Sequence, residues 1–423
     1  MIAALALLFA ARIVTLDQAV QTARERQPQL RQARANTEAA GARARQSFSP
    51  LLPQVTATAG YQRTTANAIE RPGGTSVTGV GAGSSWDTFN SFSDSIQASQ
   101  LLFDFGVQTN RWRSAKALAD AQAANEHATM LQVDYNVRAA YFDTRANQAL
   151  VQVARENLAN LQQHLQQTEG FVQAGTRAEI DLIQARADTA NARVTLINAE
   201  NAFQTSKLNL NAAMGVQEPT DYDVADVQQP PVTGEDTPLD PLLEEASKAR
   251  PEVQSLEEQI RAEQLTVRAI QGQYGPAISA TAGLQQGGTS LDKLGWNAAV
   301  GLSLTWNIFQ GGLTKAQVSE AQANVMAAVA QLDLQRQQIR SDVDSARLAV
   351  RAAKESLSAT KDALVNARER LRLAEERYAV GVGSAIELGD AQLALTQAAG
   401  QAVQADDRLS TARAQLLRAL GRQ

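Results

Sequence analysis

The segment from Trp296 to Gly312, WNAAVGLSLTWNIFQGG, alternates between two kinds of side chain. This period of two is typical of a strand whose two faces meet different environments. The residues that follow have a helical period over an unusually long stretch, so the pattern predicts one strand leading into one long helix. One strand face carries Trp296, Ala298, Val300, Leu302, Leu304, Trp306 and Ile308, and the other carries Asn297, Ala299, Gly301, Ser303, Thr305 and Asn307.

The same order of patterns occurs twice along the chain. LFDFG at 102–106 matches IFQGG at 308–312, and AGTRAEIDLIQA at 174–185 matches VGVGSAIELGDA at 380–391, both at an offset of 206 residues. Earlier in each half the offset is 223 residues, as for TATAGYQ at 56–62 and SATAGLQ at 279–285. The difference predicts that a Gly/Ser/Thr-rich surface loop, at about 63–89, is 17 residues longer in the first half.

We therefore expect two structural repeats, 13–215 and 239–423, joined by a linker at 216–238 that is rich in proline and acidic residues and forms no helix or strand. In each repeat, two helices precede two strands and a long helical hairpin. Thr15 and Asp240 are the expected N-caps of the first helices, Pro28 and Pro251 precede the second helices, and Gly215 and Gly421 end the return helices. The expected strands are 54–63, 90–105, 277–286 and 296–309, and the expected coiled-coil hairpins are 107–214 and 313–420.

The long helices carry apolar residues at heptad spacing, from Val137 to Val172 and again from Val343 to Tyr378. Such seams predict antiparallel coiled-coil hairpins, each about 100 Å long at a rise of ~1.5 Å per residue. The seams are rich in Ala and Thr, so a single hairpin is marginal and we expect more helices alongside it. The expected seam of the first return helix is Ile183, Ala187, Ala190, Val194 and Ile197.

Four strands per chain are too few to close a barrel, since small closed barrels need about eight. An open sheet in lipid leaves unpaired backbone groups at its edges, which favours closure with further copies of the chain. Two copies would supply eight strands, in a barrel filled by its own side chains, and three would supply twelve. We expect the face with Trp296 and Leu302 to meet lipid and the face with Asn297 and Ser303 to line a wet lumen.

Composition narrows the classes of protein. The net charge of -5 gives no electrostatic case for binding nucleic acid, and the absence of cysteine excludes disulfides, thiolate metal sites and a lipid anchor on cysteine. The apolar start, MIAALALLFAA, resembles the core of a secretory signal, so we expect residues 1–12 to be a signal-peptide remnant; the alternative is a buried first helix. No apolar run is long enough for a transmembrane helix, so a membrane would be crossed by strands.

The order, duplication and spacing of these motifs resemble the TolC-type outer-membrane efflux proteins, from about Val14 to Gly421. The resemblance implies a mainly α-helical fold with a membrane β-barrel, in which a homotrimer closes twelve strands in the outer membrane and twelve helices across the periplasm. It also implies a passive exit duct that works with a periplasmic adaptor protein and an inner-membrane pump. The motifs that carry it are SPLLPQVTATAGYQ, LLFDFGVQTN, GTRAEIDLIQARADTANA, RPEVQ, IFQGGLTKAQV and RYAVGVGSAIELGDAQLAL.

The resemblance also implies roles for the two helix–helix turns, which would form the periplasmic tip. By position, Asp181 and Tyr378 correspond to a polar link that holds the tip shut, and the alternative for Tyr378 is an aromatic residue at a widened seam. The family pattern has an arginine where this chain has Gly383, and Arg177 is a candidate substitute, although a weaker gate is the alternative. The adaptor-docking tips would be Gly175, Thr176, Arg177, Gly381, Val382 and Gly383.

Glu387 and Asp390 are three residues apart and share one helix face. In the family, acids at these positions line the entrance, and three chains would make a ring of carboxylates that favours cations. Asp181 and Asp188 are candidates to add to it, and a solvated helix face is the alternative for the whole set. The two histidines, His127 and His164, are interpreted as surface residues rather than ligands.

The sequence carries no nucleophile elbow, phosphate-binding loop or zinc motif, so we expect no enzyme activity, no cofactor and no metal. Two other functions remain open. A soluble coiled-coil scaffold or adaptor would explain the heptads but not the matched pairs of strands. A structural tube without transport would explain both, although the polar strand face favours a pore.

Overall fold

The computed structural model describes residues 12–65, 86 and 88–423, and they form two compact units. The first unit holds the described residues up to Thr37 together with Gln122–Ser255 and Gln331–Gln423. The second holds Leu256–Ala330 and the described part of Glu38–Ala121. Each unit therefore draws on both repeats. Most of the expected signal remnant and of the long loop lies outside the described residues, although Arg12 begins the first strand.

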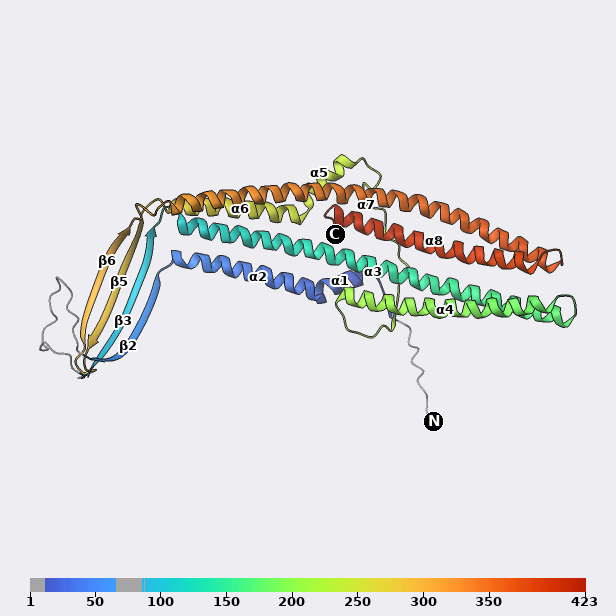
Figure 1. The fold of residues 1–423 in the computed structure, drawn as a ribbon, viewed down its shortest axis with the longest axis horizontal. Helices are drawn as coiled ribbons and strands as arrows, with labels where there is room; N and C mark the ends of the chain where they lie inside the picture. Colours follow the sequence, from blue (N-terminus) through green and yellow to red (C-terminus); the bar gives the residue numbers. More distant parts are fainter. Residues whose placement is uncertain (1–11, 66–85, 87) are drawn as a thin grey trace, which may run out of the picture. The chain divides into compact units, whose positions relative to one another are not determined.

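Each repeat folds in the same order, with two shorter helices, two strands and two long helices (Figure 1). The duplicated unit expected from the sequence is thus confirmed. None of the described helices has a segment both long and apolar enough to span a bilayer. The first repeat comprises α1 (Leu16–Arg26), α2 (Pro28–Phe48), β2 (Gln54–Thr65), β3 (Thr88–Phe103), α3 (Val107–Gln173) and α4 (Glu179–Met214). The second comprises α5 (Leu239–Ala249), α6 (Pro251–Gly272), β5 (Ala277–Gly288), β6 (Gly295–Thr305), α7 (Leu313–Ala379) and α8 (Ala385–Ala419).

Local signals set most helix ends. Thr15 caps α1 as expected, and its hydroxyl accepts a hydrogen bond from the third backbone N–H of the helix. The expectation for Asp240 is wrong, because α5 begins directly after Pro238, and Asp240 lies in the first turn. Its carboxylate still lies near the positive end of the helix dipole there. Gly215 and Gly421, with φ of 71° and 72°, follow the return helices as expected.

In the second unit, four strands form an antiparallel sheet in the order β2-β3-β5-β6 (Figure 1). The register places mainly small and apolar residues on one face, together with Arg63 and Asp94, and mainly polar and small residues on the other. Val300 is 88% exposed and Leu302 is 75% exposed, so the apolar face lies open in the single chain. One apolar row is Ala57, Ile96, Leu284 and Ala298, and the polar row beside it is Thr58, Ser95, Gln285 and Asn297.

Two strands end earlier than expected. β3 ends at Phe103 rather than at residue 105, and β6 ends at Thr305 rather than at residue 309. In the first case the Asp104 carboxylate accepts hydrogen bonds from two backbone N–H groups at the start of α3, at 3.1 and 2.7 Å. In the second the Trp306 indole N–H donates to the carbonyl oxygen of Tyr274 at 3.0 Å. Side-chain hydrogen bonds to the backbone compete with strand pairing, so the chain leaves the sheet at these positions.

In the first unit, the linker contains a strand that the sequence analysis missed. β4 (Tyr222–Val224) pairs in parallel with β1 (Arg12–Val14). The Tyr222 ring is buried, and its hydroxyl donates to Oδ1 of Asn211 at 2.9 Å. The missed signal is a Tyr and a Val two residues apart in an otherwise polar segment, which is too short for a periodicity argument.

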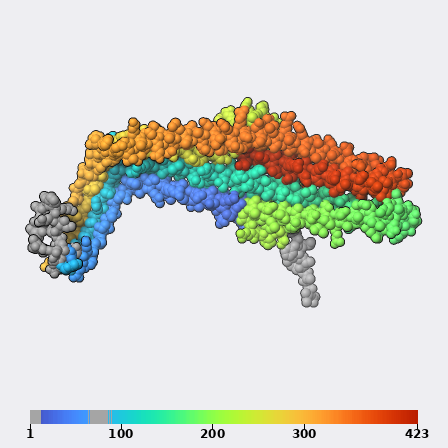
Figure 2. All heavy atoms as spheres, viewed as in Figure 1, coloured from blue at the N-terminus to red at the C-terminus, as the bar shows by residue number. Residues whose placement is uncertain are grey.

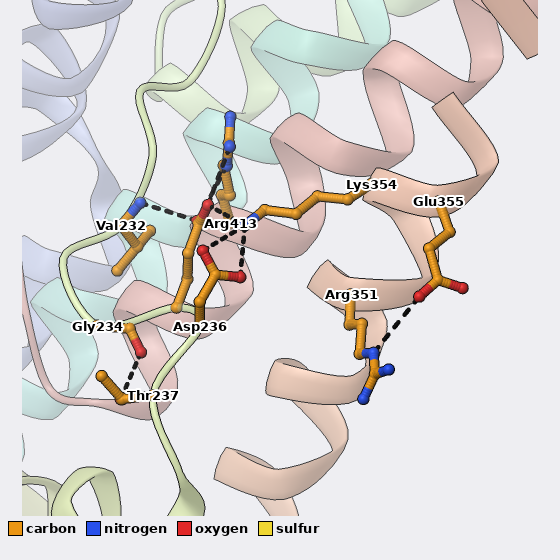
Figure 3. Close-up of polar contacts among 9 residues, drawn as sticks. Val232, Gly234, Asp236, Thr237, Arg351, Lys354, Glu355 and Arg413 are labelled. Carbon is orange, nitrogen blue, oxygen red and sulfur yellow. Dashed lines mark hydrogen bonds and ion pairs between the residues drawn. The ribbon is translucent and has the colours of Figure 1, made fainter. Parts of the chain in front are cut away.

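The linker also contacts both helices of the second hairpin through the buried carboxylate of one residue. Glu235 lies in the linker, and its side chain is 4% exposed. It forms ion pairs with Arg413 on α8 at 3.0 Å and Lys354 on α7 at 2.7 Å. Figure 3 shows Lys354 and Arg413 extending from these helices, with Lys354 also bound to Asp236. Burial alone would raise the pKa of Glu235, but its hydrogen bonds from Arg413 and Lys354 outweigh burial and lower that pKa.

The heptad seams of the long outgoing helices are buried at Val137, Val343 and Val350, as expected. The expected seam of the return helix α4 is wrong, because Ile183, Val194 and Ile197 are each 56% exposed. The smaller Ala185 and Ala192 face the interior instead. Alanine allows close helix packing within the chain, so the larger aliphatic side chains are left on the outside.

Candidate functional site

The two helix–helix turns have the same backbone geometry. The N–H groups of Gly175 and Thr176 donate to carbonyl oxygens in the last turn of α3, at 3.0 and 2.9 Å. Those of Gly381 and Val382 repeat both bonds into α7, each at 3.1 Å. This pair of bonds is the Schellman motif, which needs a residue with positive φ, and the two glycines have φ of 72° and 82°. The ends of the two hairpins lie side by side (Figures 1 and 2).

The turns expose large aliphatic side chains. Four of them are between 67% and 76% exposed. Exposed apolar clusters of this kind mark protein interaction sites more often than isolated surface residues do. The four are Ile180 after the first turn and Val380, Val382 and Ile386 around the second.

Gly383 has a structural reason to be glycine. Its N–H donates to the carbonyl oxygen of Arg377 at 2.9 Å, and the residue is buried. A Cβ atom at this position would lie 2.9 Å from the backbone nitrogen of Tyr378. An arginine here, as in the family pattern, would therefore require the turn to shift.

Tyr378 lies in the seam between the two hairpins and is 4% exposed. The Phe171 and His164 rings of α3 approach its ring at 6.4 and 5.2 Å between centroids. The Arg177 guanidinium lies over the ring, with Cζ 4.4 Å from the centroid. Nη2 of Arg177 also donates to the carbonyl oxygens of Tyr378 and Gly383, at 3.4 Å each. The tyrosine thus contacts the first hairpin through its ring.

The hydroxyl group of Tyr378 does not make the expected polar link within this chain. It is buried and has no hydrogen-bond partner within the described part of the chain. A link from this hydroxyl to Asp181 is therefore not formed between these two residues of one chain. Asp181 lies in the first turn of α4. Both residues are at the tip, as expected, but the structure does not join them.

The two acidic residues on α8, Glu387 and Asp390, lie in different surroundings. Glu387 forms an ion pair with Arg377 at 3.2 Å, and both side chains are partly exposed. Its backbone N–H also donates a hydrogen bond at 3.1 Å to the hydroxyl oxygen of Ser384, the N-cap of α8. Asp390 is exposed one turn further on. On α4, Asp188 accepts a hydrogen bond from Gln184 at 2.9 Å. Asp390 is thus the more freely solvated member of the pair.

His164 is only partly a surface residue, contrary to the expectation. Its Nδ1 atom is buried and has no hydrogen-bond partner among the described residues. Burial lowers the pKa of the imidazole, and the carboxylates of Asp188 and Asp181 on α4 partly offset this by raising it. The helical pattern alone placed His164 at a polar position, and only the contact with Tyr378 from α7 reveals its burial.

Most of this chain aligns with proteins of one family. The model of the outer membrane efflux protein family matches residues 19–216 and 242–422. A probable efflux pump outer membrane protein of Pseudomonas putida, SepC, is 28% identical over 279 residues, which is 65% of this chain and 55% of SepC. TolC of Escherichia coli is 27% identical over 90% of this chain and 77% of its own length. The toluene efflux pump outer membrane protein TtgC of Pseudomonas putida is 26% identical over 96% of this chain and 82% of its own.

Solved structures share the fold. The CmeC outer membrane channel of Campylobacter jejuni has a TM-score of 0.82 and 19% identity, over 96% of this chain and 85% of CmeC. The open-state MtrE outer membrane channel of Neisseria gonorrhoeae has a TM-score of 0.79 and 22% identity, over 96% of this chain and 89% of MtrE. Since the family model covers both repeats, the chain belongs to the outer membrane efflux protein family.

Proposed function

We propose that this chain forms, as a homotrimer, a passive exit duct in the outer membrane that conducts substrates from the periplasm to the exterior. The observation that carries this proposal is the contrast between the two faces of the sheet. One face is mainly apolar or small, with exposed Val300, Leu302 and Leu304 on β6, and its charged residues in the described strands are Arg63 and Asp94. The opposite face carries mainly Ser, Thr, Asn, Gln and small residues, without a charged side chain in the described strands. Lipid on one side and water on the other account for both.

Closure of the barrel requires further copies. In the described residues β2 and β6 are the edges of the sheet, each paired on one side only. Three chains supply twelve strands, with β6 of one copy pairing with β2 of the next. The exposed aliphatic side chains of α4 supply a matching contact between helices. Each repeat, 13–215 and 239–423, then contributes two strands to the barrel and one hairpin to the periplasmic tunnel.

The tip would carry the contacts with the rest of the pump. The residues of the two turns, Gly175, Thr176, Arg177, Gly381, Val382 and Gly383, dock a periplasmic adaptor protein that connects the duct to an inner-membrane pump. The exposed Val380, Val382 and Ile386 support this, since an unpartnered apolar cluster favours a protein contact. Asp181 and Tyr378 lie where the tip opens and closes. Glu387 and Asp390 of three chains form the acidic entrance ring.

Native mass spectrometry of the detergent-purified protein tests the assembly, and planar-bilayer recording tests the pore. We expect a species of about three times 45.3 kDa that conducts ions across the bilayer. A monomer that stays soluble without detergent would favour the coiled-coil scaffold. A trimer that inserts but never conducts, even after its tip is opened by mutation, would favour the structural tube.

A further inference from the structure

We propose that the ends of α2 and α3 beside the sheet form a binding surface for the anionic phosphate groups of lipids in the periplasmic leaflet of the outer membrane. Five basic side chains make up this surface, which we call the basic collar. The inference rests on the proposed function, because it requires the sheet to lie in the membrane. The collar consists of Arg43 and Arg45 on α2 and of Arg111, Arg113 and Lys116 on α3.

The collar is distinguished by its charge and its position. Its members lie in the last six residues of α2 and the first ten of α3, at the ends that lead from and into the sheet (Figure 1). All five are exposed, and none forms an ion pair with a described residue. No acidic residue occurs in 39–48 or 107–116, although the whole chain has a net charge of -5. Such a local excess of unpaired cations favours an anionic partner.

The second repeat shows that the fold does not require these charges. At the repeat offsets of 223 and 206 residues, four of the five collar positions are neutral in α6 and α7. The helix α7 is nevertheless as long as α3, at 67 residues. The charges therefore serve something other than helix formation. The equivalents of Arg43, Arg111, Arg113 and Lys116 are Thr266, Gln317, Ser319 and Gln322.

The spacing of the arginines places a cation on each open side of α3. Trp112 contacts Phe48 of α2, with 5.2 Å between ring centroids, and the Ser114 hydroxyl donates to a backbone carbonyl of α6 at 2.9 Å. The helix thus has neighbours on two opposite sides. Arg111 and Arg113 lie roughly 200° apart around the helix and fall between those neighbours. One of the two therefore faces the lipid, whichever side of the helix lines the lumen.

The collar also lies at the level of the lipid headgroups. The headgroup region extends about 5–8 Å beyond the hydrocarbon core, and ten residues of helix span about 15 Å. A long arginine side chain can bridge the remaining distance. Exposed aromatic side chains, Trp306 at 53% and Tyr274 at 54%, occupy the same end of the sheet. Aromatic and basic side chains together are typical of a membrane interface with anionic lipid.

Native mass spectrometry of the full-length protein released from nanodiscs tests the collar. The nanodiscs contain equal amounts of phosphatidylcholine and phosphatidylglycerol, which differ in headgroup charge. We expect the wild type to retain phosphatidylglycerol over phosphatidylcholine by about fivefold, and this preference should weaken at high ionic strength. The neutral variant takes the residues of the second repeat, so its helices should fold, and we expect its ratio to approach one. Its substitutions are Arg43→Thr, Arg111→Gln, Arg113→Ser and Lys116→Gln.

A matched control removes the same number of charges elsewhere. It carries Arg31→Gln, Arg340→Gln, Lys361→Gln and Arg368→Gln, which are exposed residues of the first unit. We expect this control to keep the wild-type lipid ratio. Equal ratios in the neutral variant and the wild type would overturn the collar. Thermal unfolding by circular dichroism shows whether each variant is folded.

Two further arms identify the ligand. If inorganic phosphate abolishes the preference and chloride at equal ionic strength does not, the site binds free phosphate and the lipid assignment is overturned. If the neutral variant keeps the lipid ratio but loses binding of an adaptor protein, the collar binds an acidic protein segment instead.

Flotation with lipid vesicles distinguishes failure of the collar from failure of the duct. A wild-type protein that inserts and conducts but retains both lipids equally overturns the collar alone. A wild-type protein that enters vesicles of neither lipid overturns the duct, and the collar with it.

Discussion

His164 packs against the edge of the Tyr378 ring, and burial lowers the pKa of its imidazole below the ordinary value. Asp188 and Asp181 on α4 oppose this shift without cancelling it. Burial in the packed seam therefore favours the neutral form of the imidazole. The stability of the packed seam that depends on a neutral His164 is fully present above the ordinary pKa of about 6.5. It is lost as the pH falls through the lowered pKa. We expect channel conductance to rise severalfold between about pH 7 and about pH 5.

The control for this prediction lies in the chain itself, which has two histidines. His164→Gln should flatten the pH profile, and His127→Gln, which changes an exposed side chain of the same helix, should not. Burial raises the pKa of Asp407 to about 6, so this carboxylate titrates in the same range. A pH profile that survives His164→Gln would assign the dependence to Asp407 or another group instead.

Residue-scale features differ in how far the sequence predicts them. Gly175 and Gly381 could be predicted, because positive φ in a tight turn is a local requirement of the backbone. Thr15 could be predicted for the same reason, since a cap bonds to its own helix. The burial of His164 could not, because it depends on a side chain 214 residues away on another helix. Arg177 was a candidate substitute for the arginine of the family pattern, but its contact with the Tyr378 ring could not be predicted from the sequence.

At the scale of elements, the linker at 216–238, here called the strap, is joined to α7 and α8 by the buried carboxylate of Glu235. We expect Glu235→Gln to leave Arg413 and Lys354 without their shared charge partner and to destabilise the strap by about 3 kcal/mol. Hydrogen exchange measures this directly, since linker amides between 229 and 237 should then exchange about a hundredfold faster through local opening.

The matched control for the strap is Glu355→Gln. Glu355 pairs with Arg351 on the surface of α7 at 3.4 Å, with both side chains about three-quarters exposed (Figure 3). A surface pair of this kind contributes about 0.5 kcal/mol, so exchange in the linker should stay at the wild-type rate. Equal exchange rates in the two variants would mean that the buried pair does not hold the strap.

The elements themselves follow from periodicity, but the face that each helix buries does not. The heptads of α3 and α7 predicted buried residues correctly at Val137 and Val343, because these helices pack within their own chain. The same reasoning failed for Val194 and Ile197 on α4. An apolar stripe on a helix predicts that something covers it, and the pattern cannot say whether the cover comes from the same chain.

At the scale of the whole molecule, that stripe tests the proposed assembly. We expect the double substitution Val194→Lys and Ile197→Lys to reduce the trimer at least tenfold in native mass spectrometry, since two charges would be buried where aliphatic side chains pack. Thr195→Lys is the control, because this exposed residue lies on a different side of the same helix turn. A variant that remains trimeric but no longer binds an adaptor would assign the stripe to the adaptor instead.

The proposed entrance ring would depend on the trimer as well, because one chain would supply only two of its carboxylates. Arg377 lies beside Glu387 and offsets part of its charge, whereas Asp390 is exposed and has no ion pair within the described chain. We therefore expect Asp390→Asn to reduce the preference for cations over anions severalfold, and Glu387→Gln to reduce it less. Reversal potentials in asymmetric salt measure that preference, and the difference should shrink at high ionic strength because screening weakens exposed charges. Equal effects of the two substitutions would show that Arg377 does not pair with Glu387 in the assembled channel, and no effect of either would place the selectivity elsewhere along the duct.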